Sequence, residues 1–449
     1  MKAVILGAGP TGLGAGWRLN DIGHADWMLF DRMDRIGGLS TSYVDEAGFT
    51  WDVGGHVLFS HFELFDGVVE KALGGDYYSH ERECWVRILD TWVPYPFQNN
   101  IRYLPPKARD ACVEGLRSLK GAPASAANFR EWMDAVFGAG IVKYFMAPYN
   151  FKVWATPPEL MSKDWIAERV SVVDLERIER NIRDEIDDVA WGPNNLFKFP
   201  RKGGTGAIYQ GIAAEFRDRI HLKHELVGVD FGKKRLRFAN GEIVGYEKLI
   251  SALPVDQLVA MSTDASEEVL LACGDLLHNS VHVVGIGVEG RREDSRCWMY
   301  FPEGNCPFYR VTNFHNYSPF NVPEGKAGQY FSLMCEISTS EHKPVDANAV
   351  VEETIQGLIN CGLLSESERS RIVSRFHLFV PYAYPIPSVH RDRALNIIQP
   401  FLESQDVYSR GRFGAWKYEI GNMDHSFMQG VEVVDRLLNG GREKVYNGA

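Results

Sequence analysis

The residues most clearly suited to chemistry are three glycines and an acid near the start of the chain. Gly7, Gly9 and Gly12 form the pattern Gly-x-Gly-x-x-Gly directly after the apolar run 3–6, and Asp31 follows a second apolar run. In such a pattern the first glycine permits a tight turn, the second lets the backbone approach a pyrophosphate, and the third lets helix and strand pack closely. An acid about 20 residues further on typically binds a ribose hydroxyl. The spacing therefore predicts a bound dinucleotide, and by itself it does not separate NAD from FAD.

Two further glycine pairs favour FAD. Gly37-Gly38 lies a few residues past Asp31, where it would let the chain fold back across the cofactor diphosphate. Gly54-Gly55 could bring another backbone segment close to a flat ring. Because His56 lies between this pair and the apolar run 57–59, we expect its imidazole to face the isoalloxazine rather than the core.

An aromatic strip and several arginines indicate a second, phosphorylated ligand. The strip runs from Trp92 to Gln98 and suits stacking on a base. A second glycine-rich stretch, Gly203 to Gly206, and a closing segment from Arg412 to Gly421 are expected to complete the nucleotide pocket.

These residues need a fold that brings distant segments together. The runs 3–6 and 27–30, with a turn and a helix between them, predict a Rossmann-type βαβ unit. Residues 107–185 have a helical pattern, whereas 220–252 and 281–380 are rich in strand-forming runs. We therefore expect a mixed fold of the α/β and α+β classes: a discontinuous Rossmann-like FAD-binding domain, a mainly helical domain and an antiparallel sheet domain.

The domain boundaries follow from the same pattern. The FAD-binding domain is predicted at 1–90, 200–280 and 405–441, and the helical domain at 100–195. The sheet domain, which would bind the substrate, is predicted at 281–400 with part of 56–100.

Composition excludes several classes of partner. A net charge of −11 argues against nucleic acid and anionic membrane surfaces. The seven cysteines are scattered without Cys-x-x-Cys spacing, so we expect reduced thiols in a reducing compartment and no metal site. No signal peptide and no run of about 20 apolar residues is visible, so the expected location is the cytoplasm.

Longer motifs carry a family resemblance. Residues 53–61, 92–100 and 148–155 resemble the flavin-dependent UDP-galactopyranose mutases, in their eukaryotic-type branch. The similarity continues through the segments 167–170, 191–194, 306–310, 316–319 and 409–414, and spans roughly residues 1–440. It implies an isomerase that interconverts UDP-galactopyranose and UDP-galactofuranose through a covalent flavin N5–sugar adduct. It also implies that FAD must be reduced, with NAD(P)H as a possible reductant.

The resemblance also assigns residues. Arg169 and Arg310 correspond to the family's diphosphate clamps, and with His56 they form the expected catalytic set. Tyr317, Tyr384 and Tyr418 match hydroxyls that bind the diphosphate, and Asn194 matches a position near the sugar. Uridine or substrate contacts are matched by Tyr95, Phe97, Gln98, Asn150, Trp154, Trp298 and Tyr300. Phe59 and Met146 match residues of the flavin-facing pocket, and Arg412, Asn422 and Met423 match positions at the cofactor.

Three departures and three alternatives remain open at this point. Met423 replaces a polar side chain of the relatives, the approach to Tyr384 is unusual, and the segments after Pro319 and Gly441 are short, which leaves the oligomeric state open. The rivals are an amine-oxidase-type flavin oxidoreductase, a non-enzymatic binder like the GDP-dissociation inhibitors, and a mutase acting on a different UDP-sugar. Paired arginines and the aromatic strip favour the mutase over the first two.

Overall fold

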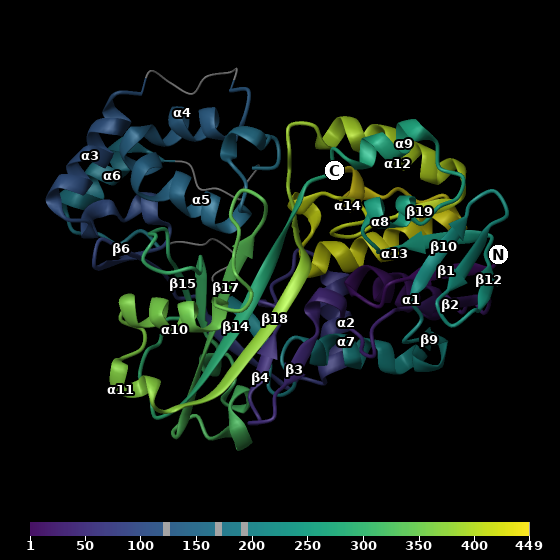
Figure 1. Cartoon of the computed structure of the whole chain (residues 1–449), viewed down its shortest axis with the longest axis horizontal. Helices are drawn as coiled ribbons and strands as arrows, with labels where there is room; N and C mark the ends of the chain where they lie inside the picture. The colour runs from purple at the N-terminus through teal and green to yellow at the C-terminus, as the bar shows by residue number, and fades with distance from the viewer. Residues whose placement is uncertain (120–125, 167–172, 190–195, 449) are drawn as a thin grey trace.

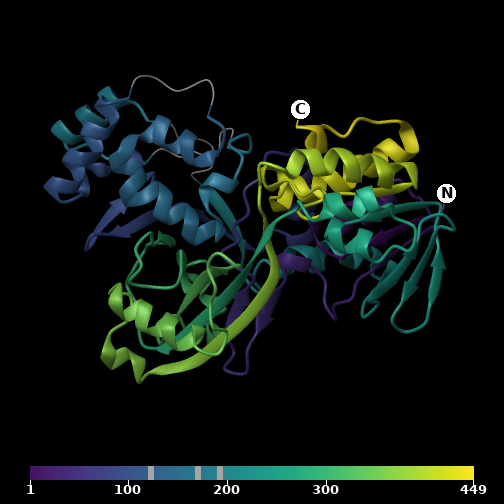
Figure 2. The same cartoon turned by 45° about the horizontal axis from the view of Figure 1, so that its top comes forward.

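The computed structural model of the chain describes residues 1–119, 126–166, 173–189 and 196–448. Three regions are visible in Figures 1 and 2: a nucleotide-type α/β region that carries both termini, a helical region, and a region built on a long, twisted sheet.

The nucleotide region is centred on a five-stranded sheet in the order β19-β13-β1-β2-β9. Its strands are β1 (Ala3–Leu6), β2 (Trp27–Phe30), β9 (Ile220–His221), β13 (Lys248–Ser251) and β19 (Val407–Ser409). All four neighbouring pairs are parallel. The strands come from the start, the middle and the end of the chain, so the discontinuous Rossmann-like fold is confirmed.

Two helices cover this sheet in direct backbone contact. α1 (Pro10–Asp21) and α13 (Met423–Asn439) cross where Gly14 and Gly430 face the partner helix. A Cβ at Gly14 would lie 2.2 Å from the carbonyl oxygen of Phe427, and one at Gly430 2.0 Å from that of Thr11. Only glycine permits this approach, which holds the N-terminus of α1 against the end of the chain.

The strand-rich segment 220–252 divides between two sheets. β10 (Leu226–Asp230), β11 (Arg235–Phe238) and β12 (Ile243–Gly245) form a three-stranded meander, and Asn240-Gly241 lies in the turn between β11 and β12. The flanking strands β9 and β13 join the parallel sheet instead. Helices α8 (Val255–Ala260), α9 (Glu267–Cys273) and α12 (Arg391–Ser404) pack beside the meander.

The largest sheet has seven strands in the order β18-β14-β17-β16-β15-β6-β7. It is antiparallel except at the β15–β6 pair. The strands are β6 (Cys84–Ile88), β7 (Thr91–Pro94), β14 (His278–Glu289), β15 (Trp298–Tyr300), β16 (Arg310–Asn313), β17 (Tyr330–Thr339) and β18 (Ile372–Pro385). α10 (Val350–Asn360) and α11 (Glu366–Arg369) lie on one side of it (Figure 1).

The helical region contains α3 (Pro106–Arg117), α4 (Phe129–Ile141), α5 (Ala147–Trp154) and α6 (Leu175–Arg183). A π-helical turn at Val142–Met146 joins α4 to α5. The remaining elements are α2 (Glu63–Leu73), α7 (Gly206–Ala213), α14 (Lys444–Asn447) and the two-stranded pairs β3 (Ser42–Val44) with β4 (Thr50–Asp52) and β5 (Tyr77–Glu81) with β8 (Leu196–Pro200).

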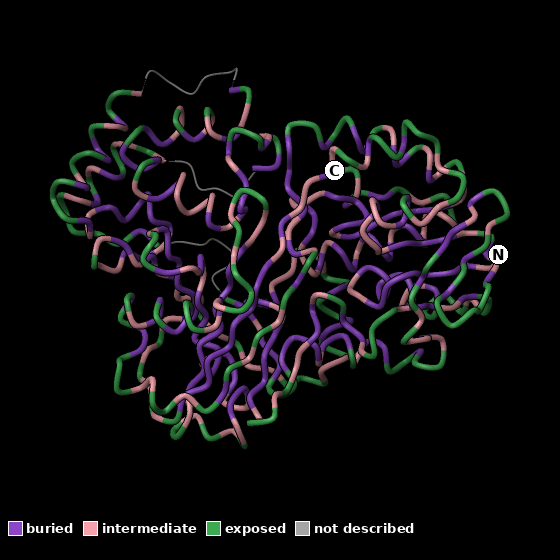
Figure 3. The backbone as a smooth tube through the Cα atoms, viewed as in Figure 1, coloured by how far each residue is buried: buried purple, intermediate pink, exposed green. Residues whose placement is uncertain are grey.

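Burial follows these regions. One apolar cluster joins the helical region to the large sheet through side chains such as Phe97, Phe137 and Trp154. Two others lie on the faces of the parallel sheet. Figure 3 shows the buried backbone concentrated in the sheets, with exposed residues on loops and outer helix faces.

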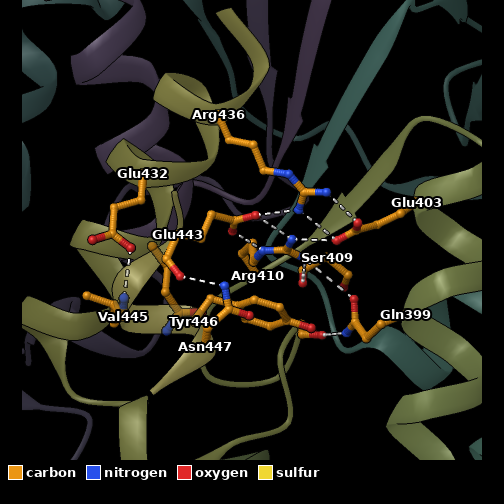
Figure 4. Close-up of polar contacts among 12 residues, drawn as sticks. Gln399, Glu403, Ser409, Arg410, Glu432, Arg436, Glu443, Val445, Tyr446 and Asn447 are labelled. Atoms are coloured by element: carbon orange, nitrogen blue, oxygen red, sulfur yellow. Dashed lines mark hydrogen bonds and ion pairs between the residues drawn. The ribbon is translucent and has the colours of Figure 1, made fainter. Parts of the chain in front are cut away.

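A charged cluster fastens the last helix to the nucleotide region (Figure 4). Arg410 is fully buried and pairs with Glu443, and its Nη2 lies 2.6 Å from Oε1 of Glu403. Arg436 bonds to both acids, at 2.7 Å each. The Arg410 guanidinium also lies 3.8 Å from the ring centre of Tyr446. Glu443 and Tyr446 are therefore packed against the nucleotide region.

Among the described residues, no helix combines the length and apolar character needed to cross a bilayer.

Candidate functional site

A cavity of about 1780 Å³ runs between the three regions. Its nucleotide end is lined by Gly7, Gly9 and Asp31, and its far end by aromatic residues of the helical region and the large sheet. This volume exceeds the roughly 300–1,000 Å³ of a typical small-molecule pocket, so the cavity has room for two ligands.

The glycine turn at the nucleotide end is shaped for a pyrophosphate. Gly7 has a φ of 101° and joins β1 to α1, whose first residue is Pro10. Gly38, with a φ of 55°, packs on Gly9 so closely that a Cβ at Gly38 would lie 3.0 Å from the Gly9 Cα. The N-terminus of α1 thus meets the cavity without side chains in between, which suits an anion.

Asp31 directly follows β2 and lies beside this turn, where the sequence predicted it. Its carboxylate accepts hydrogen bonds from the backbone N–H groups of Ala8, at 2.6 Å, and Met33, at 2.7 Å. Burial raises the pKa of this carboxyl above its ordinary value, and the two N–H donors oppose the shift. The spare lone pairs of the two oxygens can accept ribose hydroxyls.

The second glycine-rich stretch has a different role from the one we expected. Gly203 to Gly206 is not part of the cavity wall. Instead Thr205 donates its backbone N–H and, at 2.6 Å, its hydroxyl to the fully buried carboxylate of Asp52. A Cβ at Gly204 would lie 2.4 Å from the same carboxylate. The glycines here make room for a structural hydrogen-bond cluster.

The Gly54-Gly55-His56 segment lies where the three regions meet. Gly55 donates its N–H to Glu336 Oε1 at 2.9 Å, and a Cβ at this position would lie 3.0 Å from Trp298 Nε1. The His56 imidazole lines the cavity, and its Nδ1 has no hydrogen-bond partner in the described part of the chain. Burial, reinforced by the charge of Arg412, lowers the pKa of His56 to about 4, so the ring is neutral near pH 7.

Arg310 forms the charged centre of the wall. Its Nε and Nη2 bind the Glu336 carboxylate at 2.7 and 2.6 Å. The same carboxylate accepts a hydrogen bond from the Tyr309 hydroxyl at 2.8 Å. Burial raises the pKa of Glu336, but the Arg310 charge outweighs it and holds the pKa below its usual range. The pair is therefore ionised, and Nη1 of Arg310 stays outside it.

The far end is a group of aromatic rings. Tyr300 lies 5.1 Å from Tyr95 and 5.3 Å from Tyr149, measured between ring centres. Trp154 lies 4.7 Å from Tyr418, and its Nε1 donates to Asn150 Oδ1 at 3.3 Å. Such rings provide flat surfaces for a nucleobase, with amides at their edge.

Most of the predicted site residues line this one cavity: Gly7, Gly9, Asp31, Gly38, Gly55, His56, Phe59, Tyr95, Gln98, Met146, Asn150, Trp154, Trp298, Tyr300, Arg310, Tyr384, Arg412, Tyr418, Asn422 and Met423. Gly12, Gly37 and Gly54 support the turns behind the wall. Phe97 and Tyr317 are fully buried behind it, with Phe97 stacked on the cavity-lining Phe145 at 4.6 Å. Arg169 and Asn194 lie outside the described residues.

Sequence reasoning missed two charged residues. Glu336 has a visible signal, because it is a single acid within the apolar run of β17. Arg82 follows β5, lines the cavity, and lies 5.0 Å from the Trp298 ring, the same distance as Arg310. Its neighbours Glu81 and Glu83 made it resemble an ordinary surface charge.

A cluster of two histidines and one aspartate was also not predicted from the sequence. His61 and His425 each direct Nδ1 at the buried carboxylate of Asp424, at 3.0 and 2.9 Å, beside the N-terminus of α13. These three groups could hold a metal ion, but both carboxylate oxygens are engaged by the rings.

Comparison with known proteins decides the family. The model of an NAD(P)-binding Rossmann-like domain matches residues 5–87. A solved structure of reduced UDP-galactopyranose mutase shares 45% sequence identity, covers 99% of this chain and 95% of its own, and superimposes with a TM-score of 0.95. The chain belongs to the UDP-galactopyranose mutase family.

More distant structures share only the fold with this family member. A putative protoporphyrinogen oxidase from Exiguobacterium has 15% identity, covers 97% of this chain and 98% of its own, and gives a TM-score of 0.72. A putrescine oxidase variant has 13% identity with the same coverages and a TM-score of 0.65. The rival reading as an amine oxidase thus reflects a shared scaffold, whereas the enzyme type is that of the mutase family.

The cavity of this mutase-family chain fits FAD. The N-terminus of α1, the Gly9–Gly38 contact and Asp31 suit the pyrophosphate and ribose. His56 Nδ1 and the buried Trp298 Nε1, neither of which has a hydrogen-bond partner among the described residues, offer polar atoms further along the wall. Family membership supports the same cofactor.

Proposed function

We propose that this chain interconverts UDP-galactopyranose and UDP-galactofuranose, with FAD in its reduced state. The observation that carries the proposal is Arg310, whose guanidinium lines the cavity between the nucleotide turn and the aromatic group. A guanidinium makes charge-assisted bonds to phosphate oxygens, each worth about 1.5–3 kcal/mol. A flavoenzyme that oxidises an amine has no use for such a group beside its substrate.

Bound reduced FAD would supply the N5 atom that forms a covalent N5–sugar adduct at C1 of galactose as UDP leaves. Arg310 holds the diphosphate and stabilises the negative charge that UDP gains on departure. Arg169 is proposed as the second clamp. Tyr384 and Tyr418 add phenol donors from the cavity wall, and Tyr317 is proposed as a third.

The remaining roles are proposed from the family resemblance, and the positions of these residues on the cavity wall support them. His56 is neutral near pH 7, so it is proposed to provide an uncharged ring beside the flavin and to add no positive charge there. Gln98 and Asn150 carry amides that can read the uracil edge or the ribose, while Tyr95, Trp154 and Tyr300 provide the stacking surface, with Phe97 behind it. Trp298 is proposed as a further uridine or substrate contact, and Asn194 is proposed to lie near the sugar.

The flavin pocket completes the assignment. Phe59 and Met146 are proposed to line its face. Asn422 and Met423 lie at the start of α13, and Arg412, from the segment after β19, donates to the carbonyl of Gly421 at 3.1 Å; these three residues are proposed to contact the cofactor. We propose NAD(P)H as the reductant that brings FAD to its active state.

The test is turnover under controlled redox conditions. The purified protein should be yellow and should convert UDP-galactofuranose to UDP-galactopyranose only after reduction by dithionite or NAD(P)H, without net oxidation of the sugar. Turnover in the oxidised state, or oxygen uptake that depends on the substrate, would instead support an oxidoreductase.

Arg310→Ala gives the residue-level test. We expect kcat/KM to fall by about 10²–10³-fold, corresponding to about 3–4 kcal/mol of transition-state stabilisation, with FAD content unchanged. Arg375→Ala is the control, because Arg375 is exposed on β18 and does not line the cavity. Near-normal kcat/KM for Arg310→Ala would remove this residue from the site.

The sugar is tested separately with a panel of UDP-sugars. Galactose is proposed from the family, and UDP-arabinopyranose and an N-acetylated UDP-hexose are the comparison substrates. If kcat/KM were highest for another UDP-sugar, the proposed mutase chemistry would stand and the proposed substrate would change.

A further inference from the structure

A buried lysine and two cysteines meet behind the cavity, outside the proposed reaction. Lys152 lies on α5, and its Nζ donates to the carbonyl oxygens of Glu303, at 2.8 Å, and Cys306, at 3.0 Å. The third contact is with Cys306 Sγ at 3.4 Å. Only 6% of Lys152 and 5% of Cys306 are exposed.

The buried ammonium group of Lys152 needs an anionic partner. Lys152 forms no ion pair with Asp or Glu in the described part of the chain. A buried ammonium is costly unless it is paired, and the nearest group able to carry a negative charge is the Cys306 sulfur. When protonated, that thiol instead donates to the Phe308 carbonyl oxygen at 3.5 Å.

The surroundings favour the thiolate. Burial raises the pKa of the Cys306 thiol, but a hydrogen bond from Cys361 and the nearby Lys152 ammonium outweigh it and bring the pKa below its ordinary value. Burial lowers the pKa of Lys152. A thiolate beside a lysine is the reactive form of cysteine.

Cys361 supplies a second thiol in contact with the first. It caps the C-terminal end of α10, is 2% exposed, and belongs to the same buried cluster as Cys306. Its Sγ lies 3.9 Å from the side-chain oxygen of Asn305, the residue directly before Cys306. α10 packs tightly on this segment, because a Cβ at Gly357 would lie 2.9 Å from the Cys306 Cβ. Both cysteines are reduced in the structure.

We propose that Cys306 and Cys361 form a reversible disulfide, with Cys306 as the attacking thiolate and hydrogen peroxide as the oxidant. The Cys306 sulfur takes one peroxide oxygen and becomes a sulfenic acid, and hydroxide leaves. The Cys361 sulfur then displaces that oxygen, which leaves as water with the Cys361 thiol proton. The proton that Cys306 released on forming its thiolate converts the hydroxide to the second water. Two thiols lose two electrons in total, and one peroxide becomes two waters.

Oxidation of the two thiols is expected to change the binding of UDP in the cavity. The disulfide is neutral, so Lys152 loses the thiolate that its Nζ contacts. α5 carries Asn150 and Trp154 on the cavity wall, and Cys306 begins the segment that leads into Arg310 on β16. We therefore expect oxidised protein to bind UDP several-fold more weakly, with recovery after dithiothreitol.

The chemical test is thiol counting with peptide mapping. After treatment with hydrogen peroxide, wild-type protein should lose two of its seven thiols in denaturant, and mass spectrometry should find one linked peptide pair, Cys306 with Cys361. In Cys361→Ser the reaction should stop at a sulfenic acid on Cys306 that dimedone traps. Cys112→Ser, which removes a buried thiol of α3, should leave the Cys306–Cys361 linkage intact.

The lysine is tested through the pH dependence of alkylation at Cys306. Lys152→Met should shift the rate profile to higher pH and slow the reaction at pH 7 by about tenfold for each unit that the pKa rises. If that variant does not fold, the wild-type profile still decides, because its midpoint must lie below that of Cys112.

Several results would overturn the proposal: all seven thiols surviving peroxide, Cys306 linked to the neighbouring Cys335, or a midpoint for Cys306 at or above that of Cys112. The thiol chemistry is independent of the proposed function, whereas the effect on UDP rests on it. A disulfide that forms without changing UDP affinity would leave the modification site standing and refute its coupling to the cavity.

Discussion

Arg310 on β16 and Glu336 on β17 face each other across the sheet and form two parallel hydrogen bonds, Nε to Oε1 at 2.7 Å and Nη2 to Oε2 at 2.6 Å. Glu336 Oε1 also accepts the Gly55 N–H at 2.9 Å. One buried carboxylate therefore holds both the guanidinium proposed to bind the substrate and the backbone segment that leads to His56.

Glu336→Gln tests this double role. The amide keeps the shape of the side chain but loses the charge and one acceptor, so we expect Arg310 to sample other positions. Mutase kcat/KM should fall by about 10–100-fold, while FAD content stays near normal. The control is Glu289→Gln, at an exposed end of β14. An unchanged kcat/KM would show that Arg310 positions itself without Glu336.

The cofactor turn is tested at two glycines that both have positive φ. Gly38→Ala places a methyl group 3.0 Å from the Gly9 Cα, and we expect the purified protein to lose most of its bound FAD. Gly23→Ala meets nothing within 4 Å, so it should cost about 1 kcal/mol of stability from backbone strain and retain FAD. Flavin absorbance per chain is the measurement. Equal FAD content in the two variants would argue against the proposed pyrophosphate site.

Asp52 predicts a pH-dependent stability. Burial raises the pKa of its carboxyl from 3.8 to about 6, despite hydrogen bonds from Ser42 and Thr205. Between these values the folded state binds more protons than the unfolded state, so the Asp52 contribution to stability falls as pH rises from about 4 to 6, by about 3 kcal/mol. Asp52→Asn should remove that contribution.

The measurement for Asp52 is urea unfolding from pH 4 to pH 7. The difference in unfolding free energy between wild type and Asp52→Asn should change across this window, whereas an exposed control, Asp218→Asn, should show a constant difference. Parallel curves for wild type and Asp52→Asn would refute the raised pKa.

The charged cluster at the end of the chain predicts a large effect on stability. Glu443→Ala removes the anion that Arg410 and Arg436 share and leaves Arg410 buried with Glu403 as its remaining acid. We expect a loss of about 3–5 kcal/mol in unfolding free energy. The adjacent exposed Lys444→Ala should change it by less than about 0.5 kcal/mol. An equal loss of unfolding free energy in the two variants would mean that the ion pairs of Glu443 do not stabilise the fold.

The sequence predicted features that depend on local pattern. Gly7 to Gly12 and Asp31 could be assigned because their spacing alone determines a turn, a helix start and a ribose contact. The family motifs led to most of the cavity wall. Glu336 could not be matched to Arg310, because their contact depends on the register of β16 against β17, which local sequence does not specify.

For the glycine-rich stretch 203–206, the local pattern led us to expect a place in the nucleotide pocket, but the stretch does not line the cavity. Its composition resembles a phosphate loop, but its partner is the buried Asp52, which lies about 150 residues away at the end of β4. A glycine permits another group to approach the backbone closely, but it does not specify which group that is. Only the assembled fold shows that it is a carboxylate here.

The strand order β19-β13-β1-β2-β9 has a consequence for biosynthesis. β1 and β2 leave the ribosome first, β13 follows only after more than half of the chain has been made, and β19 comes close to the end. One edge of β1 therefore stays unpaired until β13 has been made. The cavity is complete only when the late segment that contains Arg412 and Asn422 has also been made, which places capture of the cofactor after that point.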